Sequence, residues 1–208
     1  MFLDPLHTPG FKRTLFNAIV APRPIGWIST LDAEGRANLA PFSQFNLVST
    51  APPVVMFSCN TPDDRPEKDT LANARRNGEF VANLATWELR EAVNLSSTPC
   101  PPGEDEFVLA GLAKADAVYV RAPRVAASPA SLECRVMRII ELPAEHPGET
   151  VSHVVFGRVV GVHLDDAHVT PEGRFDTARA RPLTRLGGLQ YATPGEIFEL
   201  PSHFARAR

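Results

Sequence analysis

The sequence has few cysteines, and the three that it has lie far apart in a chain of 208 residues. Cys59, Cys100 and Cys134 form no Cys-x-x-Cys pair, which argues against both a disulfide framework and a thiolate zinc site. The six histidines likewise form no His-x-x-x-His or His-Glu-x-x-His pair. We therefore expect no metal site, and we expect three reduced thiols in a cytoplasmic protein.

The sequence also lacks a large excess of either charge, with a formal net charge of −3. A charge so close to balance does not favour a nucleic-acid partner. No run of apolar residues is long enough to span a bilayer, and the first residues, which include Asp4, do not look like a signal peptide. We therefore expect neither nucleic acid nor membrane as a partner, and one domain over residues 1–208.

Several common nucleotide-binding and catalytic motifs are missing as well. Gly10, Gly26 and Gly35 have the wrong spacing for a Gly-x-Gly-x-x-Gly fingerprint or a P-loop, and no Gly-x-Ser-x-Gly motif occurs. Any nicotinamide must therefore bind without a Rossmann module. The sequence also shows no convincing pair of acid and base residues, an absence that fits an enzyme whose cofactor carries the chemistry.

What the sequence does contain is a series of short β-strand patterns, with 20 prolines that interrupt longer elements. The clearest patterns lie at residues 131–142, where apolar and charged residues alternate, and at 150–164, where Gly157 and Gly161 are available as bulge or bend sites. Long antiparallel strands of this kind point to a mainly β barrel with a few short helices. We expect further strands at residues 25–31, 36–49, 53–59 and 79–84, and a short helix at 104–113.

Two other short helices are expected. One covers residues 68–77 and ends at Gly78. Its apolar stripe, Leu71 and Ala74, is thin, so we expect this helix to serve its N-terminus more than the core. The other helix begins at Thr86, which we expect to cap it.

The junction at Lys68, Asp69 and Thr70 is the best candidate for binding an anion. The first N–H groups of a helix are free and lie at its positive end, so a phosphate could bind there with help from Lys68 and Thr70. Arg65, in the preceding loop, could add a second cation. The alternative is an ordinary surface helix capped by Asp69 or Thr70, which is the commoner case on spacing alone.

Two neighbouring strands, together with Asn46, offer a second candidate surface. Small and hydroxyl-bearing residues there could let a flat ring lie against the backbone, whose N–H and C=O groups would meet the polar edge of the ring. The alternative is a hairpin whose polar residues face water. The residues concerned are Ile28, Ser29, Thr30, Ala40, Pro41, Phe42 and Ser43.

Five segments of the chain together resemble a known family. They read RPIGWIST, GRANLAPFSQFN, KDTLANARRNGEFVANL, SHVVFGRVVGVHLDD and RLGGLQY, and they extend over most of the sequence. The combination resembles the flavin reductase-like proteins of the FMN-binding split-barrel superfamily. The resemblance implies a split β-barrel with Greek-key topology and about six antiparallel strands. It also implies a homodimer that binds FMN non-covalently near the subunit interface.

The resemblance also gives roles to particular residues. It implies that Lys68, Asp69 and Thr70 contact the FMN phosphate, and it favours the flavin interpretation of the two strands. It places Arg185 and Tyr191, in the RLGG segment, near the active site. It also implies a role for His153 at the flavin or the nicotinamide, although a polar partner in a half-buried sheet is the alternative for His153 and the preferred interpretation of His163.

Three functions remain open from the sequence. The first is an FMN-dependent oxidoreductase that passes electrons from NADH or NADPH to flavin and on to an acceptor. The second is an FMN-binding electron carrier without nicotinamide turnover. The third, outside the family, is a barrel that binds a different apolar ligand.

Overall fold

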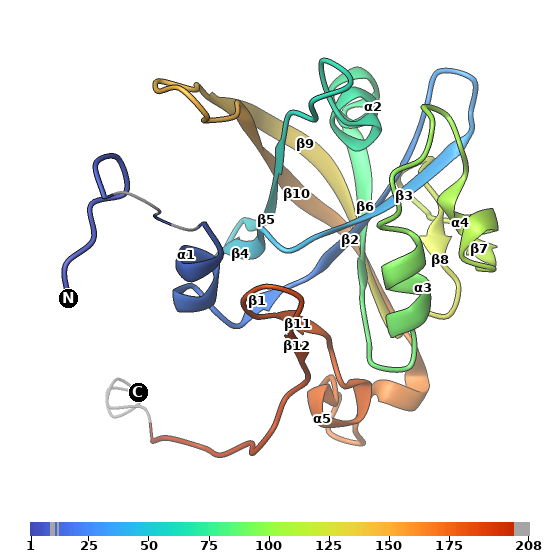
Figure 1. Cartoon of the computed structure of the whole chain (residues 1–208). Coiled ribbons are helices and arrows are strands. Elements are labelled where there is room, and N and C mark those ends of the chain that lie inside the picture. Colours follow the sequence, from blue (N-terminus) through green and yellow to red (C-terminus); the bar gives the residue numbers. More distant parts are fainter. Residues whose placement is uncertain (9–10, 12, 202–208) are drawn as a thin grey trace.

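The computed structural model describes residues 1–8, 11 and 13–201, and the fold is mainly β (Figure 1). Its centre is one antiparallel sheet of seven strands in the order β3-β2-β6-β9-β10-β5-β4. The prediction of an antiparallel, mainly β fold is confirmed, with seven strands in this sheet in place of about six. The strands are β2 Gly26–Leu31, β3 Ala37–Phe42, β4 Phe45–Thr50, β5 Pro53–Asn60, β6 Glu79–Leu84, β9 Ala130–Leu142 and β10 Ser152–Leu164.

The two edge strands of the sheet, β3 and β4, are consecutive in the chain and are separated only by Ser43 and Gln44. The sheet must therefore curl until its edges approach each other. At that corner the backbone N–H of Ser58 donates to the carbonyl of Gln44 (2.8 Å). The prediction of one strand over residues 36–49 is therefore wrong. The break was missed because no Gly, Asn or Asp stands at the corner to mark it.

β9 and β10 form the longest hairpin of the fold, with 13 residues in each strand. The register shifts between Phe156 and Gly157 and between Val159 and Gly161, which confirms both glycines as sites of irregularity. At Gly157 an added Cβ would lie 2.3 Å from the ring of Phe80. Glycine is therefore required there by packing, and not by the backbone conformation.

The core inside the curled sheet is built on three phenylalanines. The ring centroids of Phe42 and Phe57 lie 5.0 Å apart, and those of Phe57 and Phe80 lie 5.2 Å apart in an edge-to-face pair. A second cluster on the other side of the sheet includes Trp27 and Phe107, both fully buried. The sheet thus buries apolar side chains on both faces.

α2 (Asp69–Asn77) packs against this sheet and contributes more to the core than predicted. Leu71 and Ala74, its thin apolar stripe, are buried within the phenylalanine cluster. The expectation that α2 serves mainly its N-terminus is therefore wrong, because a narrow stripe suffices when it faces a well-packed sheet. The helix ends at Gly78, as predicted, where φ is +67° and the glycine N–H donates to the carbonyl of Ala74.

None of the helices in the described part of the chain is long and apolar enough to span a membrane. The elements outside the seven-stranded sheet, apart from α2, are all short. Thr86 does not cap a helix: it forms a bridge with Pro182, and α3 starts only at Arg90. The short elements are α1 Arg13–Ile19, β1 Arg23–Pro24, α3 Arg90–Leu95, α4 Glu106–Leu109, β7 Lys114–Ala115, β8 Arg124–Val125, η1 Asp166–His168, α5 Thr177–Ala180, β11 Thr184–Arg185 and β12 Tyr191–Ala192.

A buried carboxylate, Glu133 on β9, ties the loop at residues 117–121 to the sheet. Its two oxygens accept hydrogen bonds from the N–H groups of Val118, Tyr119 and Val120 (2.5–3.0 Å). The same carboxylate contacts Nε2 of His163 at 2.5 Å. His163 is thus a polar partner in the sheet, as predicted.

Candidate functional site

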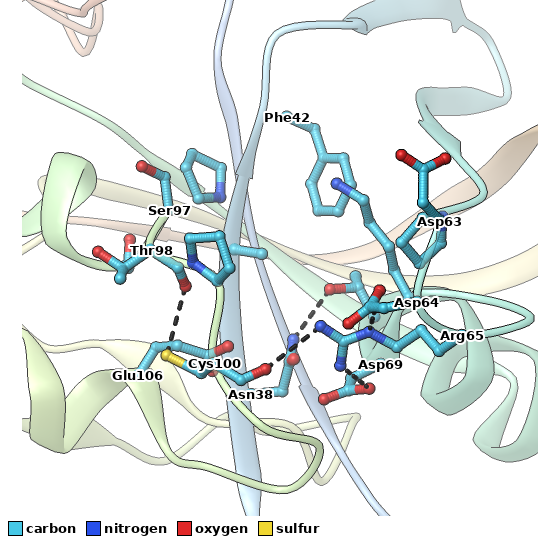
Figure 2. Close-up of a pocket in the computed structure, with 17 residues that line it drawn as sticks. Asn38, Phe42, Asp63, Asp64, Arg65, Asp69, Ser97, Thr98, Cys100 and Glu106 are labelled. Carbon is cyan, nitrogen blue, oxygen red and sulfur yellow. Dashed lines mark hydrogen bonds and ion pairs between the residues drawn. The ribbon is translucent and has the colours of Figure 1, made fainter. Parts of the chain in front are cut away.

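A cleft of about 500 Å³ opens beside the N-terminus of α2 (Figure 2). Its walls come from β3, from the loop between β5 and α2, and from the loop that follows α3. The cleft is within the size range of small-molecule sites. Seven residues predicted to bind the cofactor line it together: Ala40, Pro41, Phe42, Arg65, Lys68, Asp69 and Thr70.

The start of α2 carries no side-chain cap, contrary to the expectation that Asp69 or Thr70 would supply one. Lys68 occupies the N-cap position and makes no side-chain cap hydrogen bond. Within the described part of the chain, the N–H groups of Asp69 and Thr70 also make no hydrogen bond. These free donors at the positive end of a nine-residue helix suit an anion.

Lys68 is the most available cation of the cleft. Its ammonium group lies 5.7 Å from the centre of the Phe42 ring, and it forms no ion pair with any residue that the structure describes. Arg65, by contrast, is held by three partners. Its guanidinium lies 3.5 Å from Asp64 and 3.4 Å from Asp69, and it donates to the carbonyl of Cys100 (3.2 Å) (Figure 2).

Thr70 is buried, and a residue that the sequence did not single out fixes its hydroxyl. The side-chain amide of Asn38 on β3 donates to Thr70 Oγ1 (2.9 Å). This bond uses Oγ1 as an acceptor, so the hydroxyl hydrogen stays available for a ligand in the cleft. Nothing in the local sequence around Asn38 signals this contact, because the partners are 32 residues apart.

A buried carboxyl group, Glu106 at the start of α4, also lines the cleft, and the sequence did not identify it. Its side chain accepts a hydrogen bond from the N–H of Leu39 on the edge strand β3 (2.8 Å). The residue is only 8% exposed, and burial raises the pKa of its carboxyl although the Leu39 hydrogen bond opposes this. Asp63 and Asp64 stand at the exposed rim, so the cations of the cleft face several acidic groups.

Three predicted residues, Ile28, Ser29 and Thr30, lie on β2, directly inside the edge strand β3, and do not line the cleft. All three are fully buried on β2. Ser29 donates to the carbonyl of Pro123, and Thr30 accepts from the side-chain amide of Asn73 (3.0 Å). Their side chains therefore hold β2 to neighbouring segments.

Two more predicted residues, Ser43 and Asn46, lie at the corner between β3 and β4, outside the cleft lining. Ser43 is half-buried in the turn, and Asn46 is exposed on β4. The side-chain oxygen of Asn46 accepts from the N–H of Leu47 (2.8 Å). Contact of either residue with a cofactor stays a prediction.

Arg185 and His153 also lie outside the cleft lining. Arg185, on β11, stacks its guanidinium on the ring of Tyr191 at 4.5 Å and donates to the carbonyl of Gly188. His153, on β10, has a side chain that is 10% exposed, with Nε2 3.4 Å from Glu141. Its buried Nδ1 has no hydrogen-bond partner among the described residues, and its predicted role at the flavin stays a prediction.

Known structures share this fold along nearly the whole chain. Nitrilotriacetate monooxygenase component B from Bacillus cereus superposes with a TM-score of 0.88 at 29% identity, covering 96% of this chain and 98% of that one. A protein from Shewanella frigidimarina described as having a split barrel domain superposes with a TM-score of 0.82 at 21% identity, covering 97% and 99%. The fold is therefore the split barrel that the resemblance implied.

The sequence comparisons agree with the structural ones. An uncharacterized protein of Halalkalibacterium halodurans is 37% identical over 197 residues, which cover 95% of this chain and 93% of the relative. The model of the flavin reductase like domain matches residues 20–183, a span that includes the whole cleft. This chain belongs to the flavin reductase like domain family.

Proposed function

We propose that this chain is an oxidoreductase that binds FMN in the cleft and takes electrons from NADH or NADPH for delivery to an acceptor. The observation that carries the proposal is the uncapped start of α2, with its free N–H groups beside the unpaired Lys68. This arrangement fits the phosphate of FMN, because a dianion is stabilised by free helix N–H groups and by a nearby ammonium.

The rest of the cleft fits the remainder of the cofactor. Four apolar residues, Pro41, Phe42, Pro62 and Pro99, line the cleft, and they give apolar surface for a flat ring. The Thr70 hydroxyl can donate to the phosphate, and Arg65 adds positive charge that Asp69 holds in place. When bound, FMN supplies reversible electron transfer, which the protein side chains cannot perform themselves.

A second candidate function is that of an FMN-binding electron carrier without nicotinamide turnover. The absence of a Gly-x-Gly-x-x-Gly fingerprint favours it, because no dedicated dinucleotide module is present in the sequence. The first function remains the proposal, since a nicotinamide ring needs only a brief contact with the flavin face.

Anaerobic addition of NADH or NADPH to the FMN-loaded protein should remove the visible absorption of the flavin, because the nicotinamide reduces it. The measurement is an absorption spectrum recorded after each addition, with dithionite as a positive control. Bleaching by dithionite but by neither nucleotide would select the carrier function. A protein that stays colourless after incubation with FMN and desalting would reject both functions.

We also propose that the chain forms a homodimer. The edge strand β4 exposes two apolar residues, Leu47 and Val48, and exposed apolar side chains on an edge strand favour pairing with another chain. A second copy related by a two-fold axis would cover the β4 edge of each copy at once. Two-fold symmetry is also the commonest symmetry of oligomers.

Leu47→Lys should shift the protein from dimer to monomer in sedimentation velocity, because Leu47 is 59% exposed on β4 and the new charge would be buried at the interface. Val108→Lys is the control, since Val108 is 76% exposed on the distant α4 (Figure 1). A parent protein that sediments as a monomer with bound FMN would contradict the proposal.

A further inference from the structure

A second cavity, of about 230 Å³, lies along α3. We call it the Trp87 pocket; its walls are Trp87, Arg90, Glu91, Val93, Asn94, Leu183 and Tyr191. The cleft takes Ser96 and Ser97 from the segment that directly follows α3, whereas the Trp87 pocket takes Arg90, Glu91, Val93 and Asn94 from this six-residue helix itself. The two sites share no lining residue.

Two aromatic rings of this region lie against arginine guanidinium groups. The guanidinium carbons of Arg90 and Arg181 lie 4.2 Å and 5.1 Å from the centre of the Trp87 ring. Arg185 stacks on Tyr191 in the same way. Arg90 lines the pocket, whereas Arg181 and Arg185 lie outside its lining, against the rings of Trp87 and Tyr191 that form two of its walls. Each guanidinium group can bind an anion through two N–H groups.

The acidic partners of these arginines are weak competitors for such an anion. Glu91 lies 3.5 Å from Arg90, and Glu88 lies 3.3 Å from Arg181. Both carboxylates are largely exposed to solvent, and exposed pairs of this kind are held only loosely. With two carboxylates against three guanidinium groups, the surroundings of the pocket keep a net positive charge.

The backbone at Arg181 gives an independent observation. Arg181 has φ +47° and ψ +56°, and among the described residues it is the only non-glycine residue with a positive φ. This conformation is unfavourable for any residue with a side chain. It persists because the N–H of Trp87 donates to the Arg181 carbonyl (3.0 Å) and that of Leu183 donates to the carbonyl of Ala85 (2.8 Å). Strain of this kind concentrates at functional sites.

We propose that the Trp87 pocket binds a single planar aromatic or heteroaromatic ring that carries an anionic group. The ring packs against Trp87, Leu183 and Tyr191, and the anionic group meets Arg90 in the lining, with Arg181 beside it over the same tryptophan ring. The volume lies below that of sites for drug-sized ligands, which limits the pocket to one ring system. A purine bearing phosphate and an aromatic carboxylate share this chemistry.

The test is calorimetric titration of the FMN-saturated full chain with two pairs of probes. 2′,5′-ADP is compared with adenosine, and benzoate with benzamide. At least one anionic probe should bind about tenfold or more tightly than its uncharged partner, as expected for a charge-assisted hydrogen bond. Saturation with FMN keeps the phosphate subsite of the cleft occupied, so this result does not depend on how FMN is used.

Arg181→Gly should weaken binding of the anionic probe by about tenfold or more, while its melting temperature stays the same or rises, because glycine accepts φ +47° without strain. Trp87→Phe is a second variant that keeps a smaller ring and should weaken the same probe. Arg179→Gln is the matched control: it removes one positive charge from α5 without touching the pocket, and binding should be unchanged.

The titration also shows which kind of molecule binds in the pocket. Binding of 2′,5′-ADP alone would assign the pocket to a nucleotide, and binding of benzoate alone would assign it to an aromatic acid. The proposal fails if neither anion binds the parent protein. It also fails if binding survives both Arg181→Gly and Trp87→Phe, or if Arg179→Gln weakens it equally.

Discussion

Glu133→Gln is expected to lower the free energy of unfolding by about 3 kcal/mol, the scale seen when one partner of a buried ionic cluster is removed. The Glu133 side chain is 0% exposed and accepts hydrogen bonds from Val118, Tyr119 and Val120, besides its contact with His163. Glutamine has one acceptor oxygen, and its amide NH₂ would face backbone N–H groups that then lack a partner. Urea denaturation measures the loss.

The same carboxylate makes stability depend on pH. Burial alone would raise the pKa of Glu133, but the hydrogen bonds from His163 and the backbone outweigh it and lower the pKa below its usual 4.5. The stabilisation is therefore present above pH 4.5 and is lost as the pH falls through the lower, folded-state pKa. The parent should lose stability over that range more steeply than Glu133→Gln.

Glu141→Gln is the matched control for both measurements. Glu141 lies on the same strand, β9, and also pairs with a histidine of β10, His153, at 3.4 Å. Its side chain is 64% exposed, so its removal should cost less than about 1 kcal/mol. Equal losses for the two variants would mean that burial of Glu133 carries no special energetic weight.

Lys68→Met should weaken FMN about tenfold or more while changing riboflavin little, because riboflavin has no phosphate. A hydrogen bond to a charged group contributes about 1.5–3 kcal/mol, and methionine removes the charge while keeping apolar contact with Phe42. Fluorescence titration with both flavins gives the two dissociation constants. Added salt should weaken FMN binding more in the parent than in the variant, since screening acts on the charge that is removed.

Lys114→Met controls for loss of a lysine that lies over a phenylalanine ring. Its ammonium group is 5.4 Å from the Phe107 ring and outside the cleft, so FMN binding should not change. Equal weakening of FMN and riboflavin by Lys68→Met would show that Lys68 supports the shape of the cleft and does not bind phosphate. Thr70→Val is a poorer test, because it would also leave the buried Asn38 amide without its acceptor.

The parts of the fold that the sequence predicted are those with a local cause. The alternation of apolar and polar residues along β9 and β10 sets which face of each strand is buried. Gly78 ends α2 because its own φ angle is positive. The corner at Ser43 and Gln44 has no such cause, because it is imposed by closure of the sheet. The start of α2 was wrongly predicted to be capped, because capping residues are present but make no capping bond.

The same division holds for the candidate site. Lys68 and Thr70 were predicted because they are adjacent to a helix start that sequence can locate. Asn38 and Glu106 were missed because tertiary structure alone brings them beside α2 and β3. Ile28, Ser29 and Thr30 were selected as hydroxyl-bearing or neighbouring residues, and their side chains are used in packing within the sheet. Contact of their backbone groups with a cofactor stays a prediction.

The strand order also has a consequence for how the chain folds during synthesis. β5 pairs with β4 locally, but its other partner is β10, and 104 residues separate Asn60 from Leu164. At a translation rate of about 5–20 residues per second, the largely apolar β5 waits about 5–20 s on the ribosome before β10 can cover its free edge. We expect this interval, more than the stability of the finished barrel, to set the exposure of the nascent chain to aggregation.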